Sequence, residues 1–238
     1  MRPPLSATDG VGAPCAPPVS TRRHRALRVF LAAAFTAFAA FAAAQTSGPS
    51  APEPEFNAAD RGDIAKVEHY LNGIGTMTAK FLQLAPDGTL SRGRLYLSRP
   101  GRLRVEYAPP SPILIVANGR WLIYHDFELE QTSYQSLEGS FAGFLVRETI
   151  KLDGEVIVTG LERRPGVIAV KLIMTDDPDA GRLTLTFSDQ PLMLRRWAVT
   201  DSQGLVTQVA LFNPRFSVSL DEKLFEFDVL RPPLPDDE

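Results

Sequence analysis

Short segments in which apolar and polar residues alternate with a period of two, repeated from residue 76 onward, constrain the fold of this chain most strongly. In one of them Leu103, Val105 and Tyr107 alternate with Arg104 and Glu106. Successive side chains of a β-strand point to opposite faces of its sheet, so this spacing predicts a strand with one apolar face in the core. The charged residues are expected to face water on the other side.

Turn sequences of only a few residues separate these segments. Residues 86–88 read Pro-Asp-Gly and residues 118–119 read Asn-Gly, which are typical hairpin signals. Short connections join antiparallel strands, whereas parallel strands need long crossovers. About ten or eleven short strands are expected, and a meander of that size curls on itself. We therefore predict a mainly β (α+β) fold, an incomplete antiparallel barrel, whose strands include residues 128–134 and 225–229.

Two segments have helical spacing instead. The first follows Asn57, a suitable N-cap, and carries Asp60 near the positive end of the helix dipole; it is expected to end before Gly73. The second is a short helix within residues 137–152. Both are expected to lie against the apolar inner face of the curled sheet. Their apolar residues at helical spacing include Ile64, Val67 and Leu71 in the first helix and Phe141, Phe144 and Leu145 in the second.

The N-terminus has the three parts of a secretory signal. Four arginines in residues 22–28 precede an apolar run at residues 29–41, and three alanines end at Ala44. That run spans about 20 Å as a helix, less than the roughly 30 Å of a bilayer core, although a retained anchor stays an alternative. The expected organisation is a signal peptide cleaved near Ala44 (1–44), a Pro/Ser-rich linker (45–56), a half-barrel domain (57–231) and an acidic tail (232–238).

Charge and cysteine content exclude several classes of function. The chain has 25 Lys and Arg and 28 Asp and Glu, and the first 44 residues hold five of the basic and one of the acidic residues. The remaining 20 basic and 27 acidic residues give the expected mature chain a net charge of −7. That charge argues against nucleic acid and against a purely electrostatic attachment to anionic lipid. Cys15, the only cysteine, precedes the apolar run, so no thiol remains for a disulfide, a nucleophile or a metal.

Residues for catalysis or metal binding are also few. Only His69 and His125 remain after residue 44, and neither belongs to a zinc-binding or phosphate-binding motif. We therefore expect no cofactor, no metal and no enzymatic activity, but a binding function built from apolar surface. A periplasmic lipid hydrolase stays a less favoured alternative, which would need one of these histidines as its base.

Several blocks resemble the periplasmic outer-membrane lipoprotein carrier family, of the LolA type, in the form found in α-proteobacteria. The likeness covers roughly residues 60–230, and the spacing between the Arg-Pro-Gly block and the Ile-Val block is its most specific part. The blocks are Phe81-x-Gln83, Pro-Asp-Gly at 86–88, Gly93, Arg-Pro-Gly-Arg-Leu-Arg-Val-Glu-Tyr at 99–107, Ile-Val-Ala-Asn-Gly at 115–119, Tyr124 and Leu129-x-Gln131.

The resemblance implies a carrier with helices that form a lid over a hydrophobic cavity. Such carriers take triacylated lipoproteins from an inner-membrane ABC-type release complex and carry them across the periplasm. They deliver them to an outer-membrane acceptor, or to the outer membrane directly. We expect a periplasmic monomer with this role. The alternative within the same fold is a half-barrel domain that senses lipoproteins and signals to a membrane partner.

The family's lid-locking arginine corresponds to Arg99, which has the same parity as Leu103 on the apolar face. A buried arginine needs hydrogen-bond acceptors, which lid carbonyl groups would supply. The alternative is a surface arginine at a strand end. The expected lid is the two sets of helical residues named above, although all these apolar residues also suit a solid barrel core. The expected acyl-binding cavity comprises Phe81, Leu95, Leu97, Leu103, Val105, Tyr107 and Ile115.

Overall fold

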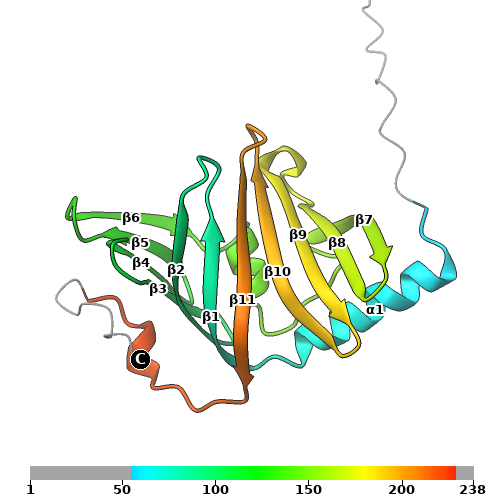
Figure 1. The fold of residues 1–238 in the computed structure, drawn as a ribbon, viewed down its shortest axis with the longest axis horizontal. Helices are drawn as coiled ribbons and strands as arrows, with labels where there is room; N and C mark the ends of the chain where they lie inside the picture. Colours follow the sequence, from blue (N-terminus) through cyan, green and yellow to red (C-terminus); the bar gives the residue numbers. More distant parts are fainter. Residues whose placement is uncertain (1–54, 229–238) are drawn as a thin grey trace, which may run out of the picture. The chain divides into compact units, whose positions relative to one another are not determined.

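The computed structural model describes residues 55–228 (Figure 1). The predicted signal peptide, residues 45–54 of the linker and the acidic tail lie outside the described residues. The helices are α1 (Ala58–Asn72) and α2 (Phe141–Leu145), with 3-10 helices η1 (Pro178–Ala180) and η2 (Glu222–Phe225). The strands are β1 (Thr76–Leu84), β2 (Leu90–Ser98), β3 (Arg102–Tyr107), β4 (Ile113–Asn118), β5 (Trp121–Asp126), β6 (Gln131–Ser136), β7 (Val156–Arg164), β8 (Val167–Met174), β9 (Gly181–Asp189), β10 (Leu192–Asp201) and β11 (Val206–Phe216).

All eleven strands belong to one antiparallel sheet in the order β6-β5-β4-β3-β2-β1-β11-β10-β9-β8-β7. Consecutive strands pair as hairpins in each half, and β1 pairs with β11 to join the two halves. The strands β6 and β7 remain at opposite edges, so the sheet does not close into a barrel (Figure 1). The predicted mainly β, incomplete antiparallel barrel with few short helices is thereby confirmed.

The core lies on the face of the sheet that packs against α1 and α2, called the inner face below. Val170 of β8 and Leu185 and Phe187 of β9 are completely buried there. Tyr70 of α1 places its ring edge-on against Phe187, with ring centroids 5.7 Å apart. The hydroxyl oxygen of Tyr70 also accepts a hydrogen bond from the backbone N–H of Leu194, at 3.1 Å. The helix α1 is thus fixed to β9 and β10 by both apolar and polar contacts.

The first helix begins at the cap that the sequence predicts. The Asn57 side chain accepts hydrogen bonds from the backbone N–H groups of Ala59 and Asp60, at 2.8 and 3.0 Å. The carboxylate of Asp60 accepts the N–H of Asn57 at 3.1 Å, which completes a reciprocal capping box. Gly73 follows the last helical residue.

The outer face of the sheet differs from the prediction over β3. Arg104 and Glu106 were expected to face water, but their exposed fractions are 2% and 4%. The two side chains form an ion pair at 2.5 Å, and the guanidinium of Arg104 donates to the carbonyl oxygen of Leu224. The expected strand at residues 225–229 is also wrong over its described residues, because Phe225 ends η2 and is buried, and residues 226–228 belong to no strand. The segment 217–228 runs from the end of β11 to η2 (Figure 1), which contacts β3 and β4 and brings the carbonyl oxygen of Leu224 to Arg104.

Two predicted elements have shifted boundaries. The expected strand at residues 128–134 is β6, which starts only at Gln131. Asp126 delays it, because its carboxylate accepts the N–H groups of Glu128 and Leu129 and closes a turn. The expected helix within residues 137–152 is limited to the five residues of α2, which Ser140 caps by accepting the N–H of Gly143.

Candidate binding site on the inner face

One arginine joins the two helices to the sheet. Arg99 follows the last residue of β2, and its Nε and Nη2 atoms donate to the carbonyl oxygen of Leu145, at 3.1 and 2.8 Å. Its Nη1 atom donates to the carbonyl oxygen of Leu71. Leu71 lies in the last turn of α1 and Leu145 is the last residue of α2, where carbonyl groups lack partners within their own helix. A single guanidinium therefore satisfies both helix ends.

The charge of Arg99 is held by neutral acceptors alone. No carboxylate bonds to this guanidinium among the described residues, and burial lowers the pKa of Arg99 to about 10. The group is still cationic at neutral pH. Burying a charge without an opposite charge is costly, and hydrogen bonds to the two carbonyl groups offset this cost only while the helices stay in place. The position of the helices and the solvation of Arg99 are therefore coupled.

The backbone after Arg99 strengthens the same junction. The N–H of Gly101 donates to the carbonyl oxygen of Val146, just after α2, at 2.7 Å, and the N–H of Gly119 donates to Gly101 at 2.9 Å. A Cβ atom on Gly101 would lie 2.8 Å from the Cα of Gly119, and φ of Gly101 is +76°. Only glycine fits this close contact of two turns in the left-handed region.

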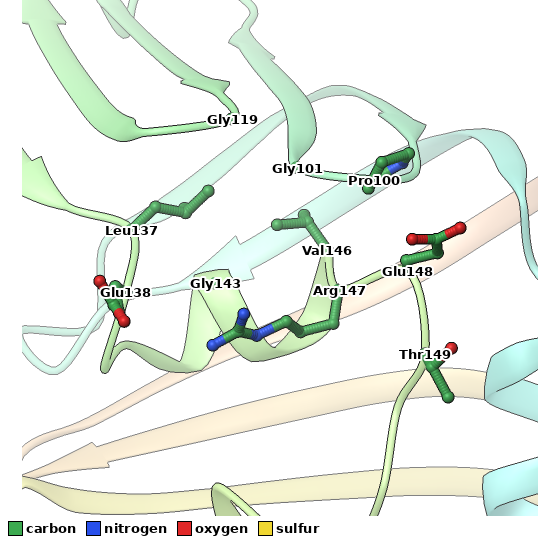
Figure 2. A pocket seen from close by; sticks show the side chains of 10 residues that line it. All are labelled: Pro100, Gly101, Gly119, Leu137, Glu138, Gly143, Val146, Arg147, Glu148 and Thr149. Carbon is green, nitrogen blue, oxygen red and sulfur yellow. The ribbon is translucent and has the colours of Figure 1, made fainter.

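A pocket of about 550 Å³ opens beside this junction, between the two turns and α2 (Figure 2). Its side chains include Glu138, Arg147 and Glu148, and Arg147 forms an ion pair with Glu155. None of the residues of the expected acyl-binding cavity lines this pocket. The pocket is therefore not the expected acyl-binding cavity, although Leu137 and Val146 of its lining belong to the apolar core.

The helix α1 is also bonded to the loop that follows α2. The side chain of Asn72 accepts from the N–H of Ile150 at 2.8 Å and donates to its carbonyl oxygen at 2.9 Å. The carboxylate of Glu68 accepts the N–H of Leu152 at 2.8 Å. These contacts could not be predicted from the sequence, since nothing in the local pattern of α1 marks Asn72 or Glu68. They couple the two parts of the expected lid to each other.

A buried ion pair fixes the N-terminal half of α1. Asp63 is 3% exposed and accepts hydrogen bonds from Arg163 of β7 and from Lys66. Burial alone would raise the pKa of Asp63, but the hydrogen bonds from both cations outweigh burial and hold the pKa below its ordinary value. Arg163 also contacts Asp189 at 3.1 Å. The sequence signal was available, because Asp63 lies four residues before Val67 on the same apolar stripe.

The residues of the expected cavity and lid all meet in one cluster. Phe81, Leu95, Leu97 and Tyr107 are buried from the sheet side, while Leu103, Val105 and Ile115 are partly buried. Val67, Leu71 and Phe144 are buried from the helix side, while Ile64, Phe141 and Leu145 are partly buried. The helices therefore lie directly on these residues, and helix side chains occupy the apolar surface of the sheet.

Aromatic residues form the part of the cluster farthest from Arg99 along β1 and β3. Phe81 and Tyr107 pack edge-on with ring centroids 5.1 Å apart. The hydroxyl of Tyr107 donates to Gln83 at 2.7 Å, and burial raises the pKa of Tyr107 to about 12. A hollow of about 590 Å³ lies at this rim of the sheet, with Tyr107 and Ile113 in its lining. Leu82 and Arg92 of the outer face line it too, so the hollow lies at the strand ends beside the buried pair of Phe81 and Tyr107.

The two histidines do not share a site. His69 is exposed on α1, which packs against the inner face of the sheet. His125 is 2% exposed and belongs to the outer face of β5. The His125 ring contacts Thr132 Oγ1 at 2.9 Å and packs edge-on against Phe127. Within residues 55–228 no group of three or more His, Cys, Asp or Glu side chains is placed to hold a metal ion.

An open antiparallel sheet with an apolar inner face, covered by two helices that one arginine holds, defines a half-barrel binding protein. The chain belongs to the family of the outer membrane lipoprotein carrier protein LolA, whose family model matches residues 72–228. This match begins at the last residue of α1.

Two relatives of known name agree with this family. The outer-membrane lipoprotein carrier protein of Pseudomonas paraeruginosa is 30% identical over 182 residues, which is 73% of this chain and 86% of that protein. The protein of the same name from Legionella pneumophila is 33% identical over 170 residues, or 66% and 81% of the two chains. The crystal structure of a LolA superfamily protein from Nitrosomonas europaea is 13% identical, with a TM-score of 0.43 over 70% of this chain and 99% of that one.

None of the helices within the described part of the chain is long and apolar enough to span a membrane.

Proposed function

We propose that this protein is a periplasmic carrier that binds the acyl chains of lipoproteins released from the inner membrane and delivers them to the outer membrane. The observation that carries the proposal is the position of Arg99, which bonds both helices over an apolar sheet face. The relatives' shared name, outer-membrane lipoprotein carrier protein, supports the same role. Its expected partners are triacylated lipoproteins, an ABC-type release complex and an outer-membrane acceptor or the membrane itself.

A carrier of this kind must limit how tightly it binds. Each buried methylene contributes about 0.8 kcal/mol, so one acyl chain of ~15 methylenes gains on the order of 12 kcal/mol on leaving water. Several chains in an open, preformed cavity would hardly dissociate. In this protein the apolar sheet residues are already covered by Val67, Leu71 and Phe144. Acyl chains therefore have to displace helix side chains. Most of the apolar sheet surface that the acyl chains would cover is already covered by these side chains in the empty protein.

The hydrogen bonds of Arg99 adjust this balance further. A hydrogen bond to a charged group contributes roughly 1.5–3 kcal/mol, and Arg99 loses such bonds when the helices move away from the sheet. They form again when the cargo leaves. The closed, empty state is thereby stabilised against the loaded state, which favours release at the destination.

The proposal predicts where an acyl chain will lie. A lipoprotein with a photoreactive group on one acyl chain should crosslink to residues of the inner face, such as Val105 and Ile115. It should not crosslink to Thr184, which faces outward on β9, where the register pairs it with Lys171 and Ala198. Depletion of the protein should leave outer-membrane lipoproteins at the inner membrane. Crosslinking to the outer face only, or normal sorting after depletion, would exclude the proposed function.

A further inference from the structure

The outer face of the central strands carries only basic charge. The strands β1, β2 and β11 contain no Asp or Glu. Four basic side chains are exposed on this face, and they are called the basic strip below: Lys80 of β1, Arg92 of β2, Arg196 of β10 and Arg215 of β11. None of the four forms an ion pair with another described residue. The chain as a whole is acidic, so this distribution does not follow from its composition.

The register of the strands brings these residues into adjacent rows. In one row Arg92 pairs with Leu82, Leu82 with Ala210, and Ala210 with Arg196. This row places two apolar side chains between two arginines across four strands. Directly paired residues of an antiparallel sheet point to the same face, so all of them face outward together.

The next row places Lys80 between two neighbours. Arg94 of β2 lies directly opposite it on one side and Phe212 of β11 on the other. On its other side Arg94 pairs with Glu106 of β3, so the exposed charge of this row that faces outward beside Phe212 is that of Lys80.

Apolar side chains lie within the basic strip and are open to solvent. Phe212 is 49% exposed and Leu82 is 39% exposed, both large values for sheet residues of this size. Phe212 also borders a hollow of about 450 Å³ between β9, β10 and β11. Arg195 and Arg196 line the same hollow and offer two guanidinium groups for an anion, whereas the Ser188 hydroxyl already donates to the carbonyl oxygen of Pro191.

We propose that the basic strip is a docking surface for an anionic phospholipid bilayer. Exposed Phe and Leu side chains flanked by long, unpaired cations match the membrane–water interface, where apolar groups enter the headgroup layer and cations meet lipid phosphates. The hollow beside Phe212 has the size and the donors for one phosphate headgroup. The net charge of the chain opposes binding at long range, so the contact is short-ranged and reversible. The inference does not depend on what the inner face binds.

Vesicle binding tests this directly. The mature protein, purified from the periplasm, is mixed with vesicles of phosphatidylcholine alone or with about 30% phosphatidylglycerol, and bound protein is separated by flotation. Binding is expected with phosphatidylglycerol only, and it should decrease at least about tenfold when salt is raised to about 0.5 M. The double variant Lys80→Glu/Arg196→Glu should bind at least about thirtyfold more weakly, since each cation near an anionic surface contributes about a factor of five.

A matched variant separates the position of the charge from its amount. Arg61→Glu/Lys151→Glu changes the net charge equally, on exposed residues away from the strip, and should lose less than about threefold in affinity. Phe212→Ser should weaken binding but keep its salt dependence. Equal binding to both vesicle types, equal losses in the two double variants, or strip-dependent binding to an acidic protein without any binding to vesicles would overturn the proposal. Binding of a fluorescent acyl probe should be unchanged in all of these variants, which keeps this test separate from the proposed carrier function.

Discussion

The carbonyl oxygens of Leu71 and Leu145 accept hydrogen bonds from the same guanidinium, that of Arg99. One residue belongs to α1 and the other to α2, so neither helix can leave the sheet without breaking bonds of the group that holds the other. The paired hydrogen bonds between Asn72 and Ile150 join α1 to the loop that follows α2 at a second point. The two helices of the proposed lid are therefore expected to open as one unit.

The variant Asn72→Ala tests this coupling. It removes both bonds to Ile150, and each contributes about 0.5–1.5 kcal/mol. Amide hydrogen exchange should become faster in α1 and in residues 146–155 together, while β8 and β9 keep their protection. Lys66→Ala, on the exposed side of the same helix, serves as a control for α1 alone. Faster exchange in α1 with unchanged exchange in residues 146–155 would show that the two parts open separately.

The effect of the buried pair Arg104–Glu106 on stability is expected to depend on whether one residue or both residues are replaced. Arg104→Met alone leaves the carboxylate of Glu106 buried without its partner, which typically costs about 3–5 kcal/mol. Replacing both residues, as Arg104→Met/Glu106→Leu, should recover most of this loss, because an apolar pair avoids the desolvation penalty. Urea unfolding of the three proteins measures the difference. A double variant less stable than the single one would contradict this explanation.

Asp63 makes stability depend on pH in the acid range. Its pKa in the folded protein lies below the ordinary value of 3.8, so its contribution is complete above about pH 4 and is lost as the pH falls through the lower, folded pKa. Asp63→Asn should lower stability by about 1–3 kcal/mol at pH 7. The difference in Tm between the two proteins should shrink steadily below pH 4. A difference that is constant from pH 7 to pH 3 would exclude this role of the carboxylate.

Two glycines give opposite predictions for the same substitution. A Cβ on Gly143 of α2 would lie 1.8 Å from the carbonyl oxygen of Leu137, so Gly143→Ala should displace α2 and destabilise the protein by about 1–3 kcal/mol. Gly62 lies within α1 with nothing within 4 Å of its Cβ position, and Gly62→Ala should stabilise by about 0.5–1 kcal/mol. Thermal unfolding of both variants checks the signs. A stabilising Gly143→Ala would show that α2 has more room than its contacts indicate.

The sequence predicted what depends on local periodicity. Alternation and turn residues indicated the strands, and Asn57 with Asp60 indicated the start of α1, because these signals lie within a few residues of what they specify. Arg99 could be identified as a site residue only from the family resemblance together with its place in the alternation, on the same face as Leu103. Its acceptors are backbone carbonyl groups, which any residue provides, so no pattern of side chains identifies them.

Contacts between segments that are distant in the chain could not be predicted from the sequence. Arg104 and Glu106 resemble any exposed face of a strand, and they are buried only because residues 217–228 fold back over them. The expected strand at 225–229 was wrong for the same reason, since Phe225 packs across the sheet instead of extending it. The basic strip likewise depends on the register between β1 and β11, which are separated by most of the domain.

Transfer of a lipoprotein from the purified, loaded carrier to outer membranes tests the central role of Arg99 most directly. Arg99→Leu keeps the bulk of the side chain but removes every donor to Leu71 and Leu145. Loading should be as good as in the wild type or better, and release should be slower by about tenfold or more, since one lost bond of ~1.5–3 kcal/mol already corresponds to that factor. Arg99→Lys should be intermediate, and Arg61→Leu, on the exposed side of α1, should transfer normally. An Arg99→Leu protein that loads and transfers at the wild-type rate would contradict the account.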